Sequence, residues 1–259
     1  MQEPVDELSL YDLTRQRLQT ALAQRTVAPH RGSPQRGAKA AGGGDLGAAL
    51  DAYAYSVCTA AGQGGAAWEQ VLGDYTDFAL ERAVDNAESK RREVVLLRRV
   101  LRAARVQGPV LDLGAGWGRL APLYEELGLA AVYAEPATLG LRLMQRSGLR
   151  GIVRAQGEEL PFARGVFPAT IVGWVLHHPP SPTVDPATIV AQAARVIRPG
   201  GLLVSVEPVR TSFEAERWTE LLQAAGFQID SLESFFDTWA RNGEREHHSL
   251  AVSRRVGGV

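Results

Sequence analysis

The sequence contains little cysteine and no long apolar run. Cys58 is the one cysteine among 259 residues, so no disulfide can form within the chain, and no group of cysteines and histidines has zinc-ligand spacing. No apolar run approaches the roughly 20 residues that cross a bilayer, and the acidic start MQEPVDELSL differs from a secretory signal, which is basic and then apolar. These absences predict a cytoplasmic protein without a membrane segment and without a metal ion.

A strong net charge is also absent. The 28 lysine and arginine residues nearly balance the 29 acidic residues, which leaves a formal net charge of −1. Without a global positive field, the sequence disfavours nucleic acid or an anionic membrane as a partner. Lysine is scarce, with only Lys39 and Lys90, and arginine supplies the remaining basic charge. We attribute this preference to the GC-rich genome of a bacterial source.

The first part of the chain shows helical patterns on either side of a flexible segment. Leucines recur at helical spacing within residues 1–27, and residues 28–47 are rich in glycine, proline, serine and arginine, which is typical of a linker. A helical pattern returns from about Leu50 to Arg105, and we expect glycines at positions 62, 64, 65 and 73 to interrupt it. We divide the chain into an N-terminal helix and linker (1–47), a second helical segment (48–88) and a remaining domain (89–259).

From Pro109 the pattern changes to short apolar runs separated by helical stretches. Near-continuous apolar strands that alternate with helices are typical of a mainly parallel sheet covered on both faces. The sequence therefore predicts an α/β fold of three layers. We expect strands at residues 110–113, 131–135, 151–155, 169–176, 201–208, 227–232 and 248–253, and helices that include 117–127, 186–196 and 213–225.

A glycine-rich turn follows the first expected strand. The segment from Asp112 contains Gly114, Gly116 and Gly118, which lets the chain turn sharply and lets a ligand approach the backbone closely. We expect a helix to start directly behind this turn and to offer free N–H groups. A dinucleotide fingerprint requires G-x-G-x-x-G, whereas Arg119 stands where its third glycine would be. The spacing therefore argues against a nicotinamide oxidoreductase.

An acidic residue closes the second expected strand. Glu135 lies about 20 residues beyond the glycine turn, where a carboxylate suits hydrogen bonding to the two ribose hydroxyls of a nucleoside. A surface carboxylate after a strand is the alternative for this residue taken alone. Together with the glycine turn upstream, it indicates a site for a ligand that contains a nucleoside.

Several motifs in order resemble the class I S-adenosylmethionine-dependent methyltransferases, especially their small-molecule group. The resemblance covers about residues 90–254 and rests on VLDLGAGWGRL, AVYAEP, AQGEELPF, VLHHPPSP and ARVIRPGGLLVSVEP. It implies a Rossmann-like fold with a seven-stranded, mainly parallel sheet whose last strand is antiparallel. Because the insertion after the fifth expected strand is short, we expect the N-terminal helices, chiefly residues 48–88, to serve as a lid over the acceptor.

The resemblance also implies roles for individual residues. The glycine turn would pass under the methionine part of the donor, and the acid after the second strand would hold its ribose. Glutamine stands where the family often has an aspartate to the adenine amino group, and its amide oxygen can still accept that hydrogen bond. The donor-binding residues that we expect are Asp112, Gly114, Ala115, Gly116, Glu135, Pro136, Gln156, Gly157, Glu158, Gly173 and Trp174.

Two histidines follow the fourth expected strand and are candidates for a general base. Histidine is the side chain that ordinarily serves as a base at neutral pH. His177 and His178 follow a strand end that faces the ligand crevice, and we prefer His178. The alternative is that this pair anchors the loop or lines the pocket. Among the aromatic residues of the N-terminal segment, we select Tyr75 as the residue that contacts the acceptor.

The predicted function is methyl transfer from S-adenosylmethionine to a small molecule by in-line displacement, which requires no metal. Three alternatives stay open: a protein that binds S-adenosylmethionine but does other chemistry, such as a cyclase; a nicotinamide oxidoreductase; and a protein or RNA methyltransferase. The near-zero net charge disfavours RNA as a substrate. The sequence leaves a homodimer open.

Overall fold

The computed structural model describes residues 6–27, 43–64, 67–177, 185–209, 214–239 and 245–256. The chain divides into two compact units, Met1–Arg91 and Arg92–Val259, which are described separately below. Within the described ranges, no helix combines the length and apolar character required to cross a bilayer.

The first unit is helical. It contains α1 (Glu7–Val27), α2 (Gly43–Gly64) and the first part of α3 (Trp68–Ala103). Leu18 of α1 and Ala54 of α2 are fully buried where these two helices pack. The indole N–H of Trp68 donates to the buried hydroxyl of Thr14 at 2.6 Å.

The glycine-rich boundaries of these helices differ from the sequence prediction. Residues 43–47, which the composition placed in the linker, are helical, because the alanine- and leucine-rich segment that follows favours a helix that extends back through them. Helix α3 continues through Gly73, where a break was predicted, because one interior glycine costs only about 1 kcal/mol and the neighbouring turns supply the remaining hydrogen bonds.

The second unit contains a seven-stranded sheet in the order β3-β2-β1-β4-β5-β7-β6. Strands β1 to β5 run parallel to one another, and β7 runs antiparallel to both β5 and β6. The predicted fold class is therefore confirmed. The strands are β1 (Val110–Leu113), β2 (Ala131–Glu135), β3 (Ile152–Arg154), β4 (Phe167–Gly173), β5 (Ile197–Val209), β6 (Phe227–Trp239) and β7 (Arg245–Arg255).

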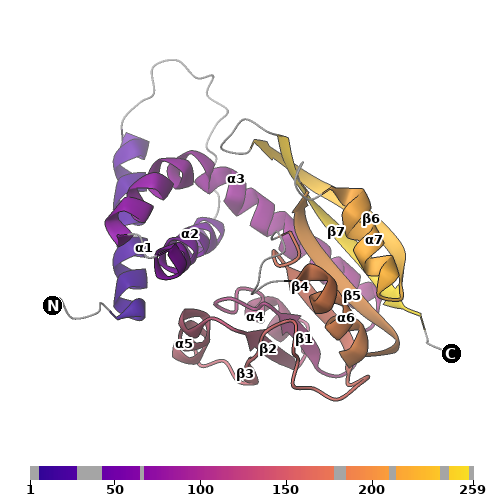
Figure 1. Ribbon diagram of the computed structural model, residues 1–259. Coiled ribbons are helices and arrows are strands. Elements are labelled where there is room, and N and C mark those ends of the chain that lie inside the picture. The colour runs from indigo at the N-terminus through magenta and orange to yellow at the C-terminus, as the bar shows by residue number, and fades with distance from the viewer. Residues whose placement is uncertain are drawn as a thin grey trace. The chain divides into compact units, whose positions relative to one another are not determined.

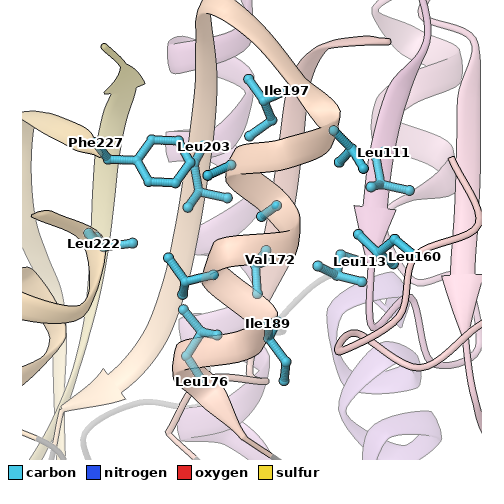
Figure 2. Close-up of a cluster of buried hydrophobic side chains, with 14 of the residues drawn as sticks. Leu111, Leu113, Leu160, Val172, Leu176, Ile189, Ile197, Leu203, Leu222 and Phe227 are labelled. Carbon is cyan, nitrogen blue, oxygen red and sulfur yellow. The ribbon is translucent and has the colours of Figure 1, made fainter. Parts of the chain in front are cut away.

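Helices cover both faces of this sheet (Figure 1). On one face, α6 (Pro186–Val196) and α7 (Ala215–Ala224) pack on a cluster that includes Leu111 and Leu113 of β1 (Figure 2). On the other, the last turns of α3, α4 (Ala121–Glu126) and α5 (Thr138–Arg146) pack on a second cluster that includes Val110. Successive residues of β1 thus enter opposite cores, which explains why the strand is apolar on both sides.

Two element boundaries near the glycine turn also differ from the prediction. Helix α4 begins at Ala121 rather than Trp117, because Gly118 has φ +81° and the segment before Ala121 forms turns. Strand β4 ends at Gly173 rather than Leu176, because Trp174 adopts φ +65° and leaves the extended conformation. Both changes lengthen the loops that follow the strands.

Candidate functional site

The carboxyl ends of the parallel strands meet at one edge of the sheet. Leu113 of β1 pairs with Ala134 of β2 and with Val172 of β4, and Gly173 pairs with Val206 of β5. The segments that follow these residues therefore emerge next to one another. In open α/β sheets, this edge is where ligands bind. We call it the site edge.

The turn after β1 has the backbone conformation that its glycines predict. Gly114, Gly116 and Gly118 have φ values of +74°, +57° and +81°, which side chains rarely allow. The N–H groups of Gly114 and Ala115 both donate to the carbonyl of Ala134 in β2. A Cβ atom at Gly114 would lie 2.4 Å from Cγ2 of Val175, so the turn packs directly against the loop after β4.

Glu135 at the end of β2 is buried and fixed by the backbone. Its Oε2 accepts from the N–H of Gly116 at 2.8 Å, and its Oε1 accepts from the N–H of Ala137 at 2.8 Å. A Cβ atom at Gly140 of α5 would lie 2.9 Å from Cγ of Glu135 and 2.5 Å from the carbonyl oxygen of Gly116. The carboxylate is thus tied to the glycine turn.

Asp112 lies within β1, below the glycine turn, and is 3% exposed. Burial raises the pKa of its carboxyl group to about 7, although the nearby Arg119 guanidinium and Tyr124 hydroxyl oppose that rise. Glu93 and Glu135 add smaller upward contributions. The carboxyl group therefore loses its proton near neutral pH, and a further positive partner would favour its charged form.

A buried ion pair lies beside Asp112. Arg119, directly after the glycine turn, contacts Oε1 of Glu93 in α3 at 2.6 Å, and their side chains are 15% and 1% exposed. Burial alone would lower the pKa of Arg119, but Glu93 and then Asp112 outweigh it and the net direction is upward. The guanidinium also explains Gly173, because a Cβ atom there would lie 2.7 Å from Nη2 of Arg119.

Trp174 begins the loop after β4 in a strained conformation. A left-handed φ of +65° costs a residue with a side chain about 1–2 kcal/mol, and such strain persists only where the surroundings enforce it. Its N–H donates to Val206 at 2.8 Å, and its indole N–H reaches Oε2 of Glu93 at 3.4 Å. The indole ring lies 4.7 Å from the ring of His248 and 6.1 Å from that of His177.

Glu207 near the end of β5 organises the same loop. Its fully buried carboxylate accepts from the N–H groups of Val175 at 3.2 Å, Leu176 at 3.0 Å and His177 at 3.3 Å. The Nδ1 atom of His177 lies 2.9 Å from Oε2 of the same carboxylate. One acid thus holds three consecutive amides and an imidazole ring.

The residues predicted to surround the adenine lie beyond β2 and β3. Pro136 and Gln156 are exposed, and Gly157 and Glu158 are partly buried. The N–H of Ala155 donates to the carbonyl of Glu135 at 3.3 Å, so this segment begins beside the end of β2. Oε1 of Glu158 accepts from the N–H of Asp185, the residue before α6, at 2.8 Å.

The sequence interpretation missed three charged residues of the site edge. Like Glu135, Glu207 is an acid near the end of an apolar strand, and this signal could have identified it. Arg119 was considered only as the missing third glycine, and Glu93 stands among several arginines without a distinguishing pattern. The preferred base His178 lies outside the described residues, as does the side chain of Tyr75. Among the described residues, no group of three or more acidic, histidine or cysteine side chains is arranged to hold a metal ion.

Comparisons with known sequences find methyltransferases that are similar to this chain in the same region. Residues 111–205 match the family model described as a methyltransferase domain. A Mycobacterium tuberculosis protein described as an uncharacterized methyltransferase is 38% identical over 96 residues, which are 36% of this chain and 37% of that protein. A Mycobacterium bovis protein with the same description matches to the same extent. The match therefore spans little more than a third of the length of these curated relatives.

Solved structures share the fold of the second unit. A SAM-dependent methyltransferase from Methanosarcina mazei has a TM-score of 0.52 at 15% identity, over 59% of this chain and 94% of that chain. The YcgJ protein from Bacillus subtilis has a TM-score of 0.52 at 15% identity, over 65% and 100%. The [4+2]-cyclase SpnF has a TM-score of 0.51 at 16% identity, over 62% and 81%. At these identities the likeness establishes the fold alone.

Proposed function

We propose that this chain transfers a methyl group from S-adenosylmethionine to a small molecule, because residues 111–205 match the model of a methyltransferase domain and the second unit shares the fold of a solved SAM-dependent methyltransferase. The observation that carries the proposal is the carboxylate of Glu135, which is buried at the end of β2 and hydrogen-bonded to Gly116. One acid is thereby positioned for a ribose at a turn whose backbone allows a close ligand.

We assign the remaining contacts of the donor from the charges and the available space of the residues around the glycine turn. S-adenosylmethionine carries an ammonium group on its methionine part, and we assign it to Asp112, whose buried carboxyl group has a pKa of about 7 and gains a positive partner on binding. Gly114, Ala115 and Gly116 supply backbone without obstructing side chains beneath that part of the donor. For the adenine we assign Pro136 and the segment Gln156, Gly157 and Glu158, and for the surroundings of the sulfonium Gly173 and Trp174.

Methyl transfer from a sulfonium depends more on how the protein positions the reactants than on catalytic side chains. The methyl carbon of a sulfonium is already activated, so the protein must hold the nucleophile, the methyl group and the sulfur in line. Such an arrangement lowers the activation free energy by up to about 7–11 kcal/mol in favourable systems. The indole of Trp174 offers an aromatic face to the sulfonium, an interaction of the cation–π kind. Residues 48–88, with Tyr75 as the acceptor contact, are our proposal for the lid.

Calorimetric titration with S-adenosylmethionine tests the donor site. We expect wild type to bind, Glu135→Ala to lose about 10²-fold in affinity because two charge-assisted hydrogen bonds disappear, and Glu135→Gln to lose less. Glu220→Ala, which removes an exposed acid of α7, is the matched control and should bind as wild type. Thermal unfolding of each variant verifies folding. Unchanged affinity in folded Glu135→Ala would remove the ribose assignment.

Methyl transfer itself requires a second measurement. The fold also occurs in a protein named as a cyclase, so the fold alone does not separate methyl transfer from other chemistry at the same donor site. Release of S-adenosylhomocysteine during incubation with fractionated small metabolites, and its absence with protein or RNA fractions, is the expected result. Donor binding without any such release would favour a non-methylating protein.

A further inference from the structure

The contact between Glu207 and His177 is more specific than loop anchoring requires. The three backbone N–H groups of residues 175–177 already secure the loop to the carboxylate. The imidazole ring is brought to the same oxygen, with Nδ1 at 2.9 Å from Oε2. Glu207 is fully buried, and the His177 side chain beside it is 12% exposed.

This geometry fixes the proton arrangement of the ring. An ionised carboxylate has only acceptor capacity, so the Nδ1 atom of His177 must carry the proton and donate it. In the neutral ring the lone pair then resides on Nε2, which makes Nε2 the basic atom. A carboxylate behind Nδ1 also stabilises the imidazolium that forms when Nε2 takes up a proton, as in other histidine bases held by an acid.

We propose that Glu207 is a positioning residue that presents Nε2 of His177 as the general base for the methyl acceptor, and that the acceptor therefore reacts through an atom that carries a proton, as in a hydroxyl group or a primary or secondary amine. The inference rests on the proposed methyl transfer and deepens it. A general base is useful for a nucleophile that must lose a proton as it attacks. A thioether or a tertiary amine has no such proton and would gain nothing from it.

The reaction balances with these groups alone. With a hydroxyl acceptor, the oxygen forms a bond to the methyl carbon while the carbon–sulfur bond breaks. The electron pair of the broken carbon–sulfur bond stays on sulfur. The hydroxyl proton moves to Nε2 of His177, and the resulting imidazolium is paired with Glu207. The products are the methyl ether and neutral S-adenosylhomocysteine, after which Nε2 returns its proton to solvent.

Titratable side chains of three elements lie around His177 in the part of the chain that the structure describes. Glu207 of β5 contacts the ring directly, and the indole of Trp174, which lies beside the ring, also contacts His248 of β7 and Glu93 of α3. Glu207 is therefore the charged group with the most direct control over the His177 tautomer. An uncharged residue at position 207 changes the control of the His177 tautomer and leaves the indole of Trp174 in place.

Nitrogen NMR of the full chain labelled with ¹⁵N-histidine tests the positioning. The sequence has five histidines, and the signals missing from His177→Gln identify those of His177. We expect wild type to show a protonated Nδ1 and an unprotonated Nε2. In Glu207→Gln the amide cannot accept on both sides, so the Nδ1–H form should lose its dominance, whereas Glu207→Asp should retain it. A wild-type ring protonated on Nε2, or a tautomer indifferent to Glu207→Gln, overturns the proposal.

Kinetics separate a base from a mere loop anchor. With the acceptor that releases S-adenosylhomocysteine, we expect kcat to fall about 10²-fold or more in His177→Gln and about 10-fold or more in Glu207→Gln, with partial recovery in Glu207→Asp. Donor affinity should stay unchanged in His177→Gln, because the three backbone N–H groups still hold the loop. Full activity of His177→Gln, or methylation of thioethers and tertiary amines but of no acceptor with a proton on the attacking atom, overturns the inference. Loss of donor binding in wild type would instead be a failure of the proposed function.

Discussion

Asp112 shows how the burial of one acidic side chain makes the stability of a fold depend on pH. Its carboxyl group is buried in β1 with a pKa raised to about 7, mainly by burial. An unfolded aspartate ionises near pH 4, so between about pH 4 and pH 7 the folded chain holds a proton that the unfolded chain has lost. Stability contributed by this group therefore decreases as pH rises through that interval. A positively charged ligand group would compensate for that loss.

We predict that Asp112→Asn stabilises the protein at pH 8 while it weakens donor binding. The amide resembles the protonated carboxyl group, so the free energy of unfolding at pH 8 should rise by roughly 1–3 kcal/mol, and the gain should shrink toward pH 5, where wild type is protonated. Urea unfolding at both pH values measures the first effect, and calorimetry with S-adenosylmethionine the second. A variant less stable than wild type at pH 8, or one that binds the donor equally well, contradicts the role assigned to Asp112.

At the scale of elements, the turn after β1 and the loop after β4 form one unit of packing. Gly114 of the turn lies against Val175 of the loop, and Glu207 of β5 holds that loop from the other side. The ion pair of Arg119 and Glu93 ties the same turn to α3. The proposed donor site thus consists of connections between strands, and the neighbouring strands of the sheet supply its rigidity.

We predict that Gly114→Ala costs more stability than Gly148→Ala, although both glycines have φ +74°. Left-handed strain should cost each variant about 1–2 kcal/mol. A Cβ atom at Gly148 meets nothing within 4 Å, whereas one at Gly114 lies 2.4 Å from Val175, so Gly114→Ala should lose a further ~1–3 kcal/mol from overpacking. Urea unfolding measures the difference.

The same pair of variants separates strain from function. Donor affinity should fall in Gly114→Ala and stay unchanged in Gly148→Ala, and Val175→Ala added to Gly114→Ala should recover part of the lost stability. Equal losses of stability in the two single variants would mean that the turn and the loop do not pack as described.

For the whole molecule, the division into two units separates the donor residues from the proposed lid. Asp112, Glu135 and Trp174 belong to the unit Arg92–Val259, whereas Tyr75 belongs to the unit Met1–Arg91. Each unit has a buried core of its own, around Leu18 in the first and around β1 in the second. Donor binding and acceptor binding should therefore affect different parts of the chain.

Hydrogen–deuterium exchange of the full chain measures this separation. With S-adenosylmethionine alone, we predict slower exchange in peptides that cover residues 110–118, 131–137 and 171–177, and unchanged exchange in α1 and α2. Addition of the acceptor should then slow exchange within residues 48–88. Glu135→Ala, which should not bind the donor well, is the control. Protection of α1 and α2 by the donor alone would assign part of the donor site to the first unit.

Local patterns in the sequence were sufficient to predict the glycine turn, an acid at the end of the second strand and the approximate positions of the strands along the chain. A positive φ favours glycine and a doubly buried strand favours a run of apolar residues, so both leave a mark on neighbouring residues. The fold class that these marks predicted is confirmed by the sheet. The roles of the individual site residues stay predictions.

Only the tertiary structure decided which charges meet. His177 and Glu207 lie 30 positions apart, and Arg119 and Glu93 lie 26 apart. No periodicity connects such residues, because the partner of a buried charge is set by which strands pair and which helix covers them. The sequence by itself determined where the backbone turns and which strand ends carry an acid, since those are properties of adjacent residues. The fold determined that Glu207 holds the His177 ring and that Arg119 lies beneath Gly173, since those contacts exist only after the sheet has formed.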